Sequence, residues 1–509
     1  MTLNRRPQPS SDDRELRLWK VGRALVVTFA AAVLVAGGVF YSLLYLLDFQ
    51  EIDSTAKLDA KTLFDLVKLS FGVVAGAGAL VALVVAYRRQ RVDEAGAHRE
   101  ATRLHTERFS VAVDKLGSDS PAVRLGGVHA LAGLADDAPD DNLRQTCIDV
   151  LCAYLQLPFT PDPGDDPAHQ EEHHRYLALR KVRHTILRLI GDHYRRPRGT
   201  HRSWQGCDLD LNGVPIDGDM DFGGAVFSGG RVSFGGAAFS GGRVSFGGAA
   251  FSGGEVSFGG AAFSGGEVSF GGAAFSGGRV SFGGAAFSGG EVSFGGAAFS
   301  GGRVSFGGAA FSGGEVSFGR AAFSGGRVSF DDAAFSGGEV SFSGAAFSGG
   351  EVSFGIATFS GSTVFFGHAA FSGGRVSFSS ATFSGGRVSF DIAAFSGGEV
   401  SFAAAAFSGG EVSFGRATFS GSTVSFGLAT FSGSTVPFDD ATFSGGTVSF
   451  AAATFSGGRV SFSSATFSGS QVSFADVRGG PAPVGLLAAV GTPVPSEITL
   501  ASHWVPLAP

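Results

Sequence analysis

The chain has 509 residues, enough for several domains, and its composition is uneven, with 81 Gly and 51 Phe beside 6 Tyr, 3 Trp and 2 Met. Its formal net charge of -7 is small for this length, which argues against a strongly basic nucleic-acid-binding protein and against a heavily acidic DNA mimic. Its 3 Cys exclude a disulfide framework and are typical of a reducing compartment.

Two uncharged apolar runs near the N-terminus predict membrane-spanning helices. They cover residues 24–47 and 69–87, and each is long enough to cross about 30 Å of hydrocarbon as a helix, although a buried core helix is the alternative for each. Residues 1–23 carry six Lys or Arg, three Arg follow the second run within residues 88–91, and the loop 48–68 holds three Lys. Because basic residues stay on the cytoplasmic side, we expect a two-span cell-membrane protein with both termini in the cytoplasm and a short loop outside.

Residues 88–200 have the pattern of a cytoplasmic stalk followed by a small helical domain. Ser120 and Pro121 have the residue types of an N-cap and a first helical position. A second helix is expected after Pro139, and a third near residues 179–189. Their apolar residues recur at helical spacing: Leu143, Cys147, Leu151, Leu155, and Leu179, Val182, Ile186, Leu189.

A twelve-residue repeat, F-S-G-G-x-V-S-F-x-x-A-x, fills most of the remaining chain in 21 copies. Its two Phe series run from Phe227 to Phe467 and from Phe234 to Phe474. The triplets 232–234 and 237–239 alternate apolar, small and apolar residues, which predicts short strands with two inward side chains each. Gly-rich segments between the triplets supply turns. Strands this short cannot bury a face alone, so the repeat predicts a stacked solenoid.

The size of one coil follows from the space that Phe needs. A twelve-residue coil would crowd two benzyl groups into a flat tube, whereas a 24-residue coil would enclose four Phe, two Val and two Ala in a four-sided interior. We therefore predict a mainly β fold of about ten coils over residues 222–475, after a lead-in at 201–221 and before a Pro-rich tail at 476–509 that either caps the last coil or hangs free. One observation favours the smaller coil: charges at the fifth repeat position alternate from Glu267 to Glu339, which would make opposite charges neighbours there. In a 24-residue coil the same charges would put Arg279, Arg303 and Arg327 on one edge and Glu291, Glu315 and Glu339 on the opposite one.

The repeat resembles the pentapeptide-repeat superfamily, in which A-x-[LF]-x-x units build a right-handed quadrilateral β-helix. Ala237-x-Phe239 and Val232-x-Phe234 fit that register, although two extra residues per unit and the lack of Asp or Asn before Phe depart from it. Residues 108–118 and 123–131 resemble a segment of two-span, membrane-anchored pentapeptide-repeat proteins of high-GC bacteria. The resemblance implies a fold and a location, and almost no activity.

Motifs for chemistry are scarce. His169 and His173 stand at i and i+4 but lack the H-E-x-x-H pattern and a third ligand, which favours a solvated helix start. Cys147 and Cys152 are too far apart for C-x-x-C and favour buried small hydrophobes. The repeat contains G-x-x-x-x-G without the Lys of a phosphate loop. We predict no catalytic, cofactor or metal site, and no enzyme.

The leading interpretation is therefore a membrane-anchored structural scaffold or interaction rod. Its expected partners are the lipid bilayer, through the two helices, and an unidentified protein on the solenoid surface, with no nucleic acid; a homo-oligomer remains open. One alternative is a disordered, self-associating Phe-Gly tract. Another is a DNA-mimicking protector of topoisomerase, which the repeat's net charge of -3, from 10 Arg and 13 Asp and Glu, disfavours.

Overall fold

The computed structural model describes residues 60–164 and 166–504, together with isolated positions between Val26 and Tyr41. The predicted span at residues 24–47 therefore lies largely outside the described residues, and the span at 69–87 falls within helix α2 (Ala60–Leu116). Within the described ranges, no helix combines the length and the apolar character needed to cross a membrane. The chain divides into two compact units, Met1–Leu104 and His105–Pro509.

Helices α3 (Pro121–Asp136), α4 (Asp141–Gln156) and α5 (Gln170–Tyr194) form a small domain with the last turns of α2. Ser120 is the extended N-cap of α3, with Pro121 at its first position, and the Asp140 carboxylate accepts the Leu143 N–H at 2.8 Å at the start of α4. Gly127 lets α3 approach α2 closely, because a Cβ there would lie 2.6 Å from the Leu116 nitrogen.

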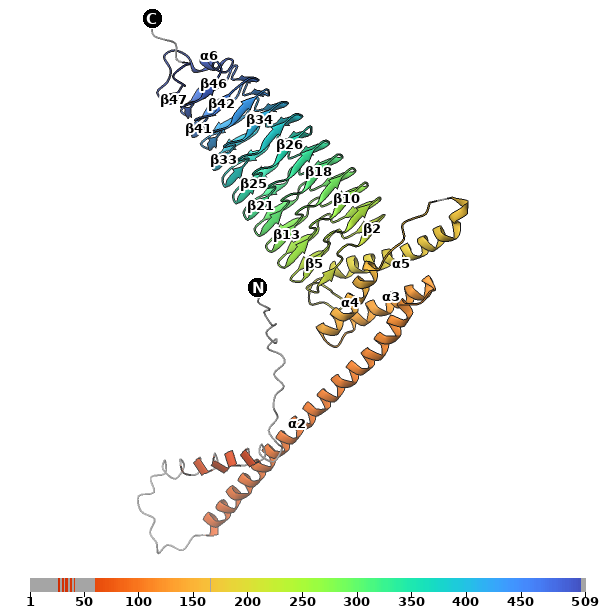
Figure 1. Ribbon diagram of the computed structural model, residues 1–509. Helices are drawn as coiled ribbons and strands as arrows, with labels where there is room; N and C mark the ends of the chain where they lie inside the picture. The colour runs from red at the N-terminus through yellow and green to blue at the C-terminus, as the bar shows by residue number, and fades with distance from the viewer. Residues whose placement is uncertain are drawn as a thin grey trace, which may run out of the picture. The chain divides into compact units, whose positions relative to one another are not determined.

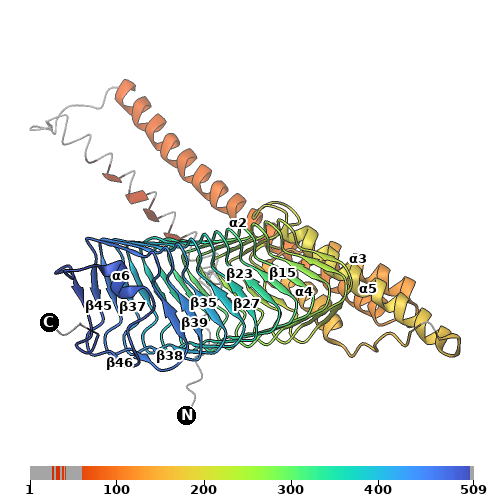
Figure 2. The ribbon, with the colours of Figure 1, turned by 90° about the horizontal axis from the view of Figure 1, so that it is seen from above.

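Beyond this domain the chain winds into a solenoid whose four parallel sheets contain 13, 12, 11 and 11 strands (Figure 1, Figure 2). One coil comprises β13 (Arg279–Ser281), β14 (Ala286–Ser288), β15 (Glu291–Ser293) and β16 (Ala298–Ser300). The next coil repeats them 24 residues later, since β13 pairs with β17 (Arg303–Ser305) and β14 with β18 (Ala310–Ser312). The prediction of a four-sided, 24-residue coil is confirmed, and the hint toward a twelve-residue coil is wrong.

The strands lie one residue away from the predicted triplets. They are x-V-S and A-F-S segments with Val or Phe in the middle, as in β13 and β14, and the Phe of V-S-F lies at the corner after the strand. That corner is a tight turn in which the Ala285 N–H donates to the Phe282 carbonyl at 3.0 Å, with Gly284 at φ +65°. The inward residues were predicted correctly, because both ends of this turn still point into the core.

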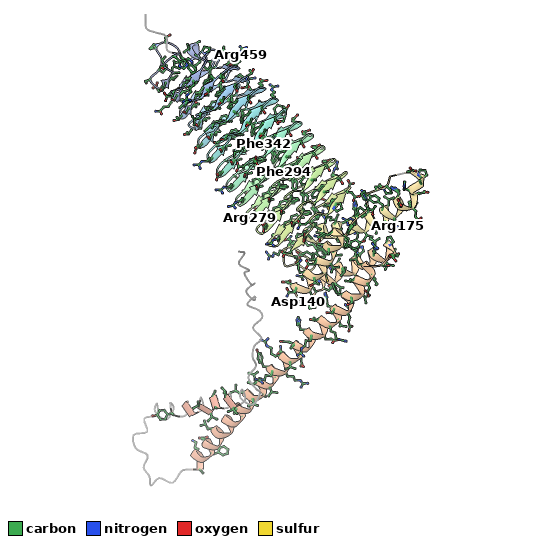
Figure 3. All side chains as sticks on the ribbon, viewed as in Figure 1. Asp140, Arg175, Arg279, Phe294, Phe342 and Arg459 are labelled. Carbon is green, nitrogen blue, oxygen red and sulfur yellow. The ribbon has the colours of Figure 1, made fainter. Side chains whose placement is uncertain are left out.

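Columns of stacked Phe rings fill the interior, and Figure 3 labels Phe294 and Phe342 of one such column. Phe294, after β15, is fully buried and stacks on Phe270 and Phe318 with ring centroids 4.8 Å apart. It also meets Phe282 and Phe306 edge to face at 5.6 and 5.5 Å, across the axis of the coil. The Phe of A-F-S strands form two further columns, so each coil buries four rings together with Val and Ala.

The other corner reads S-G-G-x in most repeats, where its second glycine is needed for two reasons. Gly290 has φ +73°, and a Cβ on it would lie 2.2 Å from the Gly266 carbonyl oxygen of the previous coil. Four repeats carry a buried Ser at that position instead: Ser362, Ser422, Ser434 and Ser470. A Cβ on Gly284, at the F-x-x-A corner, would meet nothing within 4 Å. Accordingly, later coils carry other residues at the repeat position of Gly284, among them Ile356 and Leu428 at φ +60°.

Both ends of the solenoid are covered. At its start, β1 (Leu209–Asp210), β2 (Pro215–Asp217) and β3 (Met220–Asp221) pair with the first repeat strands, beside α4 and α5. At its end, β47 (Ile498–Thr499) pairs with β45 (Gln471–Ser473), and the Trp504 ring lies 5.8 Å from Phe455 and 5.7 Å from Phe474. The described part of the tail therefore caps the last coil.

Candidate interaction surface

The fifth repeat position places its charged residues on opposite sides of the solenoid. Because a coil holds two repeats, odd and even copies of this position fall in two different sheets, those of β13 and β15. The alternating signs in the sequence thus separate in space. Arg279, Arg303 and Arg327 are consecutive register partners in one sheet and are called the arginine ladder here. The glutamate ladder occupies the other sheet and comprises Glu267, Glu291, Glu315 and Glu339.

The two ladders lie on opposite flanks of the rod. In Figure 3, Arg279 and Arg459, the first residue of β43 (Arg459–Ser461) in the sheet of the glutamate ladder, project from opposite sides. Stacking like charges is unfavourable: at a coil spacing of about 4.8 Å, each neighbouring pair of unit charges repels by about 1 kcal/mol in water. The Phe core fixes this register in spite of the repulsion.

Ion pairs along the rod form at the ends of the ladders. Arg279 contacts Glu255 at 3.5 Å and Arg327 contacts Glu351 at 2.9 Å, while Glu267 accepts from Arg243 at 2.9 Å. Within the residues that the structure describes, the central Arg303 has no carboxylate within ion-pair distance. In the same described residues, Glu291, Glu315 and Glu339 of the glutamate ladder have no basic group within ion-pair distance.

A shallow trough follows the arginine ladder along the surface. Its volume is about 700 Å³. Glycines of the S-G-G-x corners line it next to the charged side chains: Gly254, Gly278, Gly302 and Gly326 beside Glu255, Arg279, Arg303, Arg327 and Glu351. Because these glycines carry no side chains, the guanidinium groups can be reached from outside along the whole ladder.

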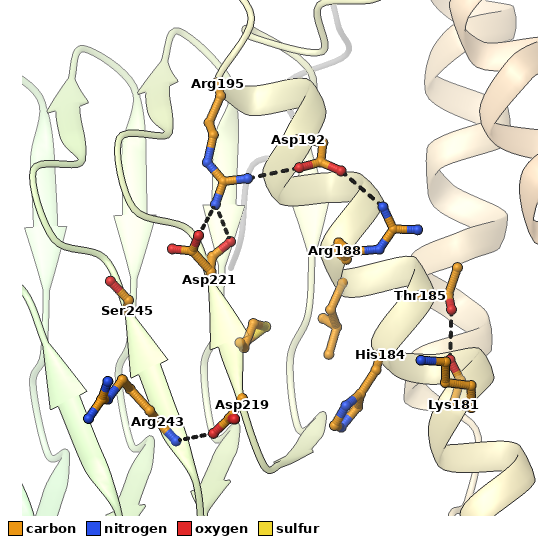
Figure 4. A pocket seen from close by; sticks show the side chains of 12 residues that line it. Lys181, His184, Thr185, Arg188, Asp192, Arg195, Asp219, Asp221, Arg243 and Ser245 are labelled. Carbon is orange, nitrogen blue, oxygen red and sulfur yellow. Dashed lines mark hydrogen bonds and ion pairs between the residues drawn. The ribbon is translucent and has the colours of Figure 1, made fainter.

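A second cavity, of about 620 Å³, lies between α5 and the first coils (Figure 4). Arg195 links both sides of it, donating to Asp192 of its own helix at 2.9 Å and to Asp221 of β3 at 2.7 Å. Arg188 also contacts Asp192, at 3.2 Å. The ion pair between Arg195 and Asp221 therefore joins the helical domain to the solenoid at this cavity.

Next to this cavity, Asp217 holds α5 to β2. Its carboxylate accepts hydrogen bonds from Tyr176 and from Arg180 Nε at 3.0 Å, and His184 Nε2 donates to its carbonyl oxygen at 2.6 Å. Burial acts to raise the pKa of Asp217, but hydrogen bonds from His184 and Tyr176 and the charge of Arg180 outweigh it and lower the pKa to about 2. Burial and the bond to Asp217 raise the pKa of Tyr176 to about 12. The ionised Asp217 carboxylate thus links α5 of the helical domain to β2 of the solenoid.

The residues weighed from the sequence lie apart from these surfaces. His173 Nδ1 contacts Asp162 at 2.7 Å near the start of α5, and the described residues contain no group of three or more ligands suited to a metal. Cys147 and Cys152 are buried in the helical domain, where burial raises their pKa to about 11 and about 12. The predicted absence of catalytic and cofactor sites remains a prediction.

Sequence reasoning missed the Asp217 cluster. Asp217 is the register partner of Ser240, so it stands where the repeat carries Ser. That departure from the repeat was a usable signal for a contact outside the solenoid. The two ladders were predicted from the sequence for a coil of 24 residues, and the strand register confirms them.

Comparison with known proteins adds no relative: no family model, no curated protein and no solved structure matches this chain. The parallel solenoid, with Phe recurring at intervals of five and seven residues, is consistent with a pentapeptide repeat. Such a repeat solenoid is the architecture of a structural or interaction scaffold.

Proposed function

We propose that this protein is a scaffold whose rod presents a long, regular surface to protein partners and performs no catalysis of its own. The observation that carries the proposal is the interior filled with Phe columns, which commits the inward side chains to packing. Function must then reside on the outside, where the strands repeat every 24 residues and form a long, regular surface. Repetition suits extended binding surfaces better than a single unique pocket.

We further propose that residues 24–47 and 69–87 attach the rod to a membrane, with the rod in the cytoplasm. Both runs lack charged residues, and basic residues predominate in residues 1–23 before the first run and in residues 88–91 after the second. On α2, apolar side chains of the second run are exposed, with Leu83 67% and Val85 50% accessible. An apolar surface of this kind requires a cover, which a bilayer supplies.

Membrane attachment is tested by fractionating cells that express the full chain. We expect the chain in the membrane pellet after an alkaline carbonate wash, and in the supernatant once residues 24–87 are deleted. Externally added protease should leave the rod of intact spheroplasts uncut. Release of the full chain by the wash, or cleavage of the rod, would contradict the proposal.

The scaffold role is tested by proximity labelling in the native host, with a labelling enzyme fused after Pro509. The comparison variant lacks residues 255–374, which removes five whole coils and keeps the helical domain, the cap and the sheet register. A scaffold predicts a reproducible set of neighbours that the shortened rod loses at unchanged abundance. The same set of neighbours with both chains would refute a role of these coils in binding.

The alternatives have less support. A disordered Phe-Gly tract does not fit strands that recur from Leu209 to Ser473 with buried Phe. Circular dichroism gives an independent test, since the solenoid predicts a strong strand signal with a cooperative melt. A DNA mimic needs acidic surface along its whole length, whereas here the glutamate ladder faces away from an arginine ladder of similar length.

A further inference from the structure

We propose that copies of this protein associate side by side, with the arginine ladder of one rod against the glutamate ladder of the next. The occupant of the trough beside Arg303 is then the acidic edge of a second copy of this chain. A rod could present partners as a monomer, so this pairing goes beyond the scaffold function.

The two ladders match in height as well as in sign. Glu291 follows Arg279 by twelve residues, which is half a coil, so each Glu is about 2.4 Å further along the rod than the preceding Arg. In a neighbouring copy without axial shift, Arg303 lies at a height between Glu291 and Glu315. Every Arg of the ladder thereby meets two Glu, and no side chain has to leave its register.

Several of the charges that would pair lack a partner within the rod, while Arg279, Arg327 and Glu267 each have one at a ladder end. Arg303, Glu291, Glu315 and Glu339 have no ion pair among the described residues. Their register neighbours carry the same sign, except for the uncharged Thr363 beside Glu339. Association relieves the repulsion along both ladders at once. The glycine-lined trough leaves room for the incoming carboxylates.

The contact joins two different surfaces, so it does not close. Each copy in a pair keeps one unused ladder, arginine on one outer flank and glutamate on the other, and a heterologous contact of this kind adds further copies into a row. If the chains share a membrane at one end, as the proposed function holds, the rods in a row are parallel. That orientation rests on the proposed attachment, whereas the pairing of the ladders does not.

Parallel and antiparallel rods would place different glutamates of the next copy opposite Arg279. In parallel rods Arg279 faces Glu267 and Glu291 of the next copy, and in antiparallel rods it faces Glu315 and Glu339. We would prepare full-length chains carrying Arg279→Cys, Glu267→Cys, Glu339→Cys or Arg303→Cys, mix them in pairs, and treat them with a short bismaleimide cross-linker. The unaltered chain gives the background from the native cysteines.

We expect cross-linked dimers from Arg279→Cys mixed with Glu267→Cys, and at least tenfold fewer from Arg279→Cys mixed with Arg303→Cys, which lie on the same edge. Dimers with Glu339→Cys instead would support the pairing and count against a common membrane end. Absence of both cross-links, or equal cross-linking on the same edge, would overturn the inference and leave the carbonate test of attachment unaffected.

Two deletions provide a second test that preserves the repeat. Removing residues 303–314 shifts every later repeat by half a coil, so Arg and Glu become mixed on both edges. Removing residues 303–326 takes out one whole coil and keeps the ladders separate. In light scattering of the purified full chain, we expect the first deletion to weaken association at least tenfold and the second to retain it with the same salt sensitivity. Equal association of the two would contradict the proposal.

Discussion

Truncating one ring of the core tests whether the Phe columns hold the coil together. Phe294 touches five other rings, two stacked and two edge to face, with Phe299 as a tilted neighbour at 6.5 Å. Phe299, in β16, touches three: it stacks on Phe275 and Phe323 and meets Phe294. Both side chains are at most 1% exposed. Comparing truncation of Phe294 with truncation of Phe299 therefore isolates the contribution of the edge-to-face contacts across the axis of the coil.

Replacing a buried Phe by Ala costs about 3–5 kcal/mol, and an aromatic pair adds about 0.5–1.5 kcal/mol beyond the buried area. With two additional edge-to-face partners, Phe294→Ala should therefore destabilise its coil by about 1–3 kcal/mol more than Phe299→Ala. Hydrogen exchange measured by mass spectrometry gives the local opening free energy, which suits a solenoid whose coils contact mainly their neighbours. Equal effects, or a larger effect of Phe299→Ala, would refute the account of the core.

Three further predictions concern the corners, the cap and the junction. Gly290→Ala should destabilise the rod by several kcal/mol more than Gly284→Ala in the same exchange experiment, because its Cβ would collide with backbone 2.2 Å away whereas Gly284 faces open space. Trp504→Ala should raise the aggregation of the full chain, seen by light scattering, because it uncovers Phe474 at an open end of four sheets. Asp217 has a pKa lowered from 3.8 to about 2, so its stabilising effect of about 2 kcal/mol is present above pH 4 and lost as the pH falls toward 2. With Asp217→Asn, the free energy of unfolding measured by chemical denaturation should vary less with pH in that window. An unchanged pH profile would exclude this stabilising role of Asp217.

The solenoid could be predicted from the sequence because the repeat length determines which strands pair and how they align. A repeat of twelve with Phe at fixed places leaves two choices of coil, and the volume of four rings decides between them. The strand limits were off by one residue because the turn Phe-x-x-Ala uses its end residues both for the corner and for the core. Alternation of apolar residues marks which side chains point inward, but not where backbone pairing stops.

The junction with the helical domain could not be predicted in the same way. Tyr176, Arg180 and His184 lie on one face of α5, and their meeting with Asp217 depends on how that helix docks on the first coil. Helical spacing places the three side chains on a common face without saying what they contact. The docking also depends on Gly191, where a Cβ would lie 2.7 Å from the Asp221 carbonyl oxygen.

The two kinds of corner explain how one rod can be uniform inside and varied outside. The S-G-G-x corner is closed to side chains at Gly290, so the inter-coil spacing is fixed there. The F-x-x-A corner opens to solvent, and in later coils it carries Ile356 and Leu428, each 66% exposed, in the left-handed region that disfavours side chains. Such substitutions change the surface and leave the Phe columns untouched. The surfaces of the first coils therefore differ mainly in charge, and those of the later coils also in apolar side chains. A scaffold of this design can bind different partners at different positions along the rod without altering its core.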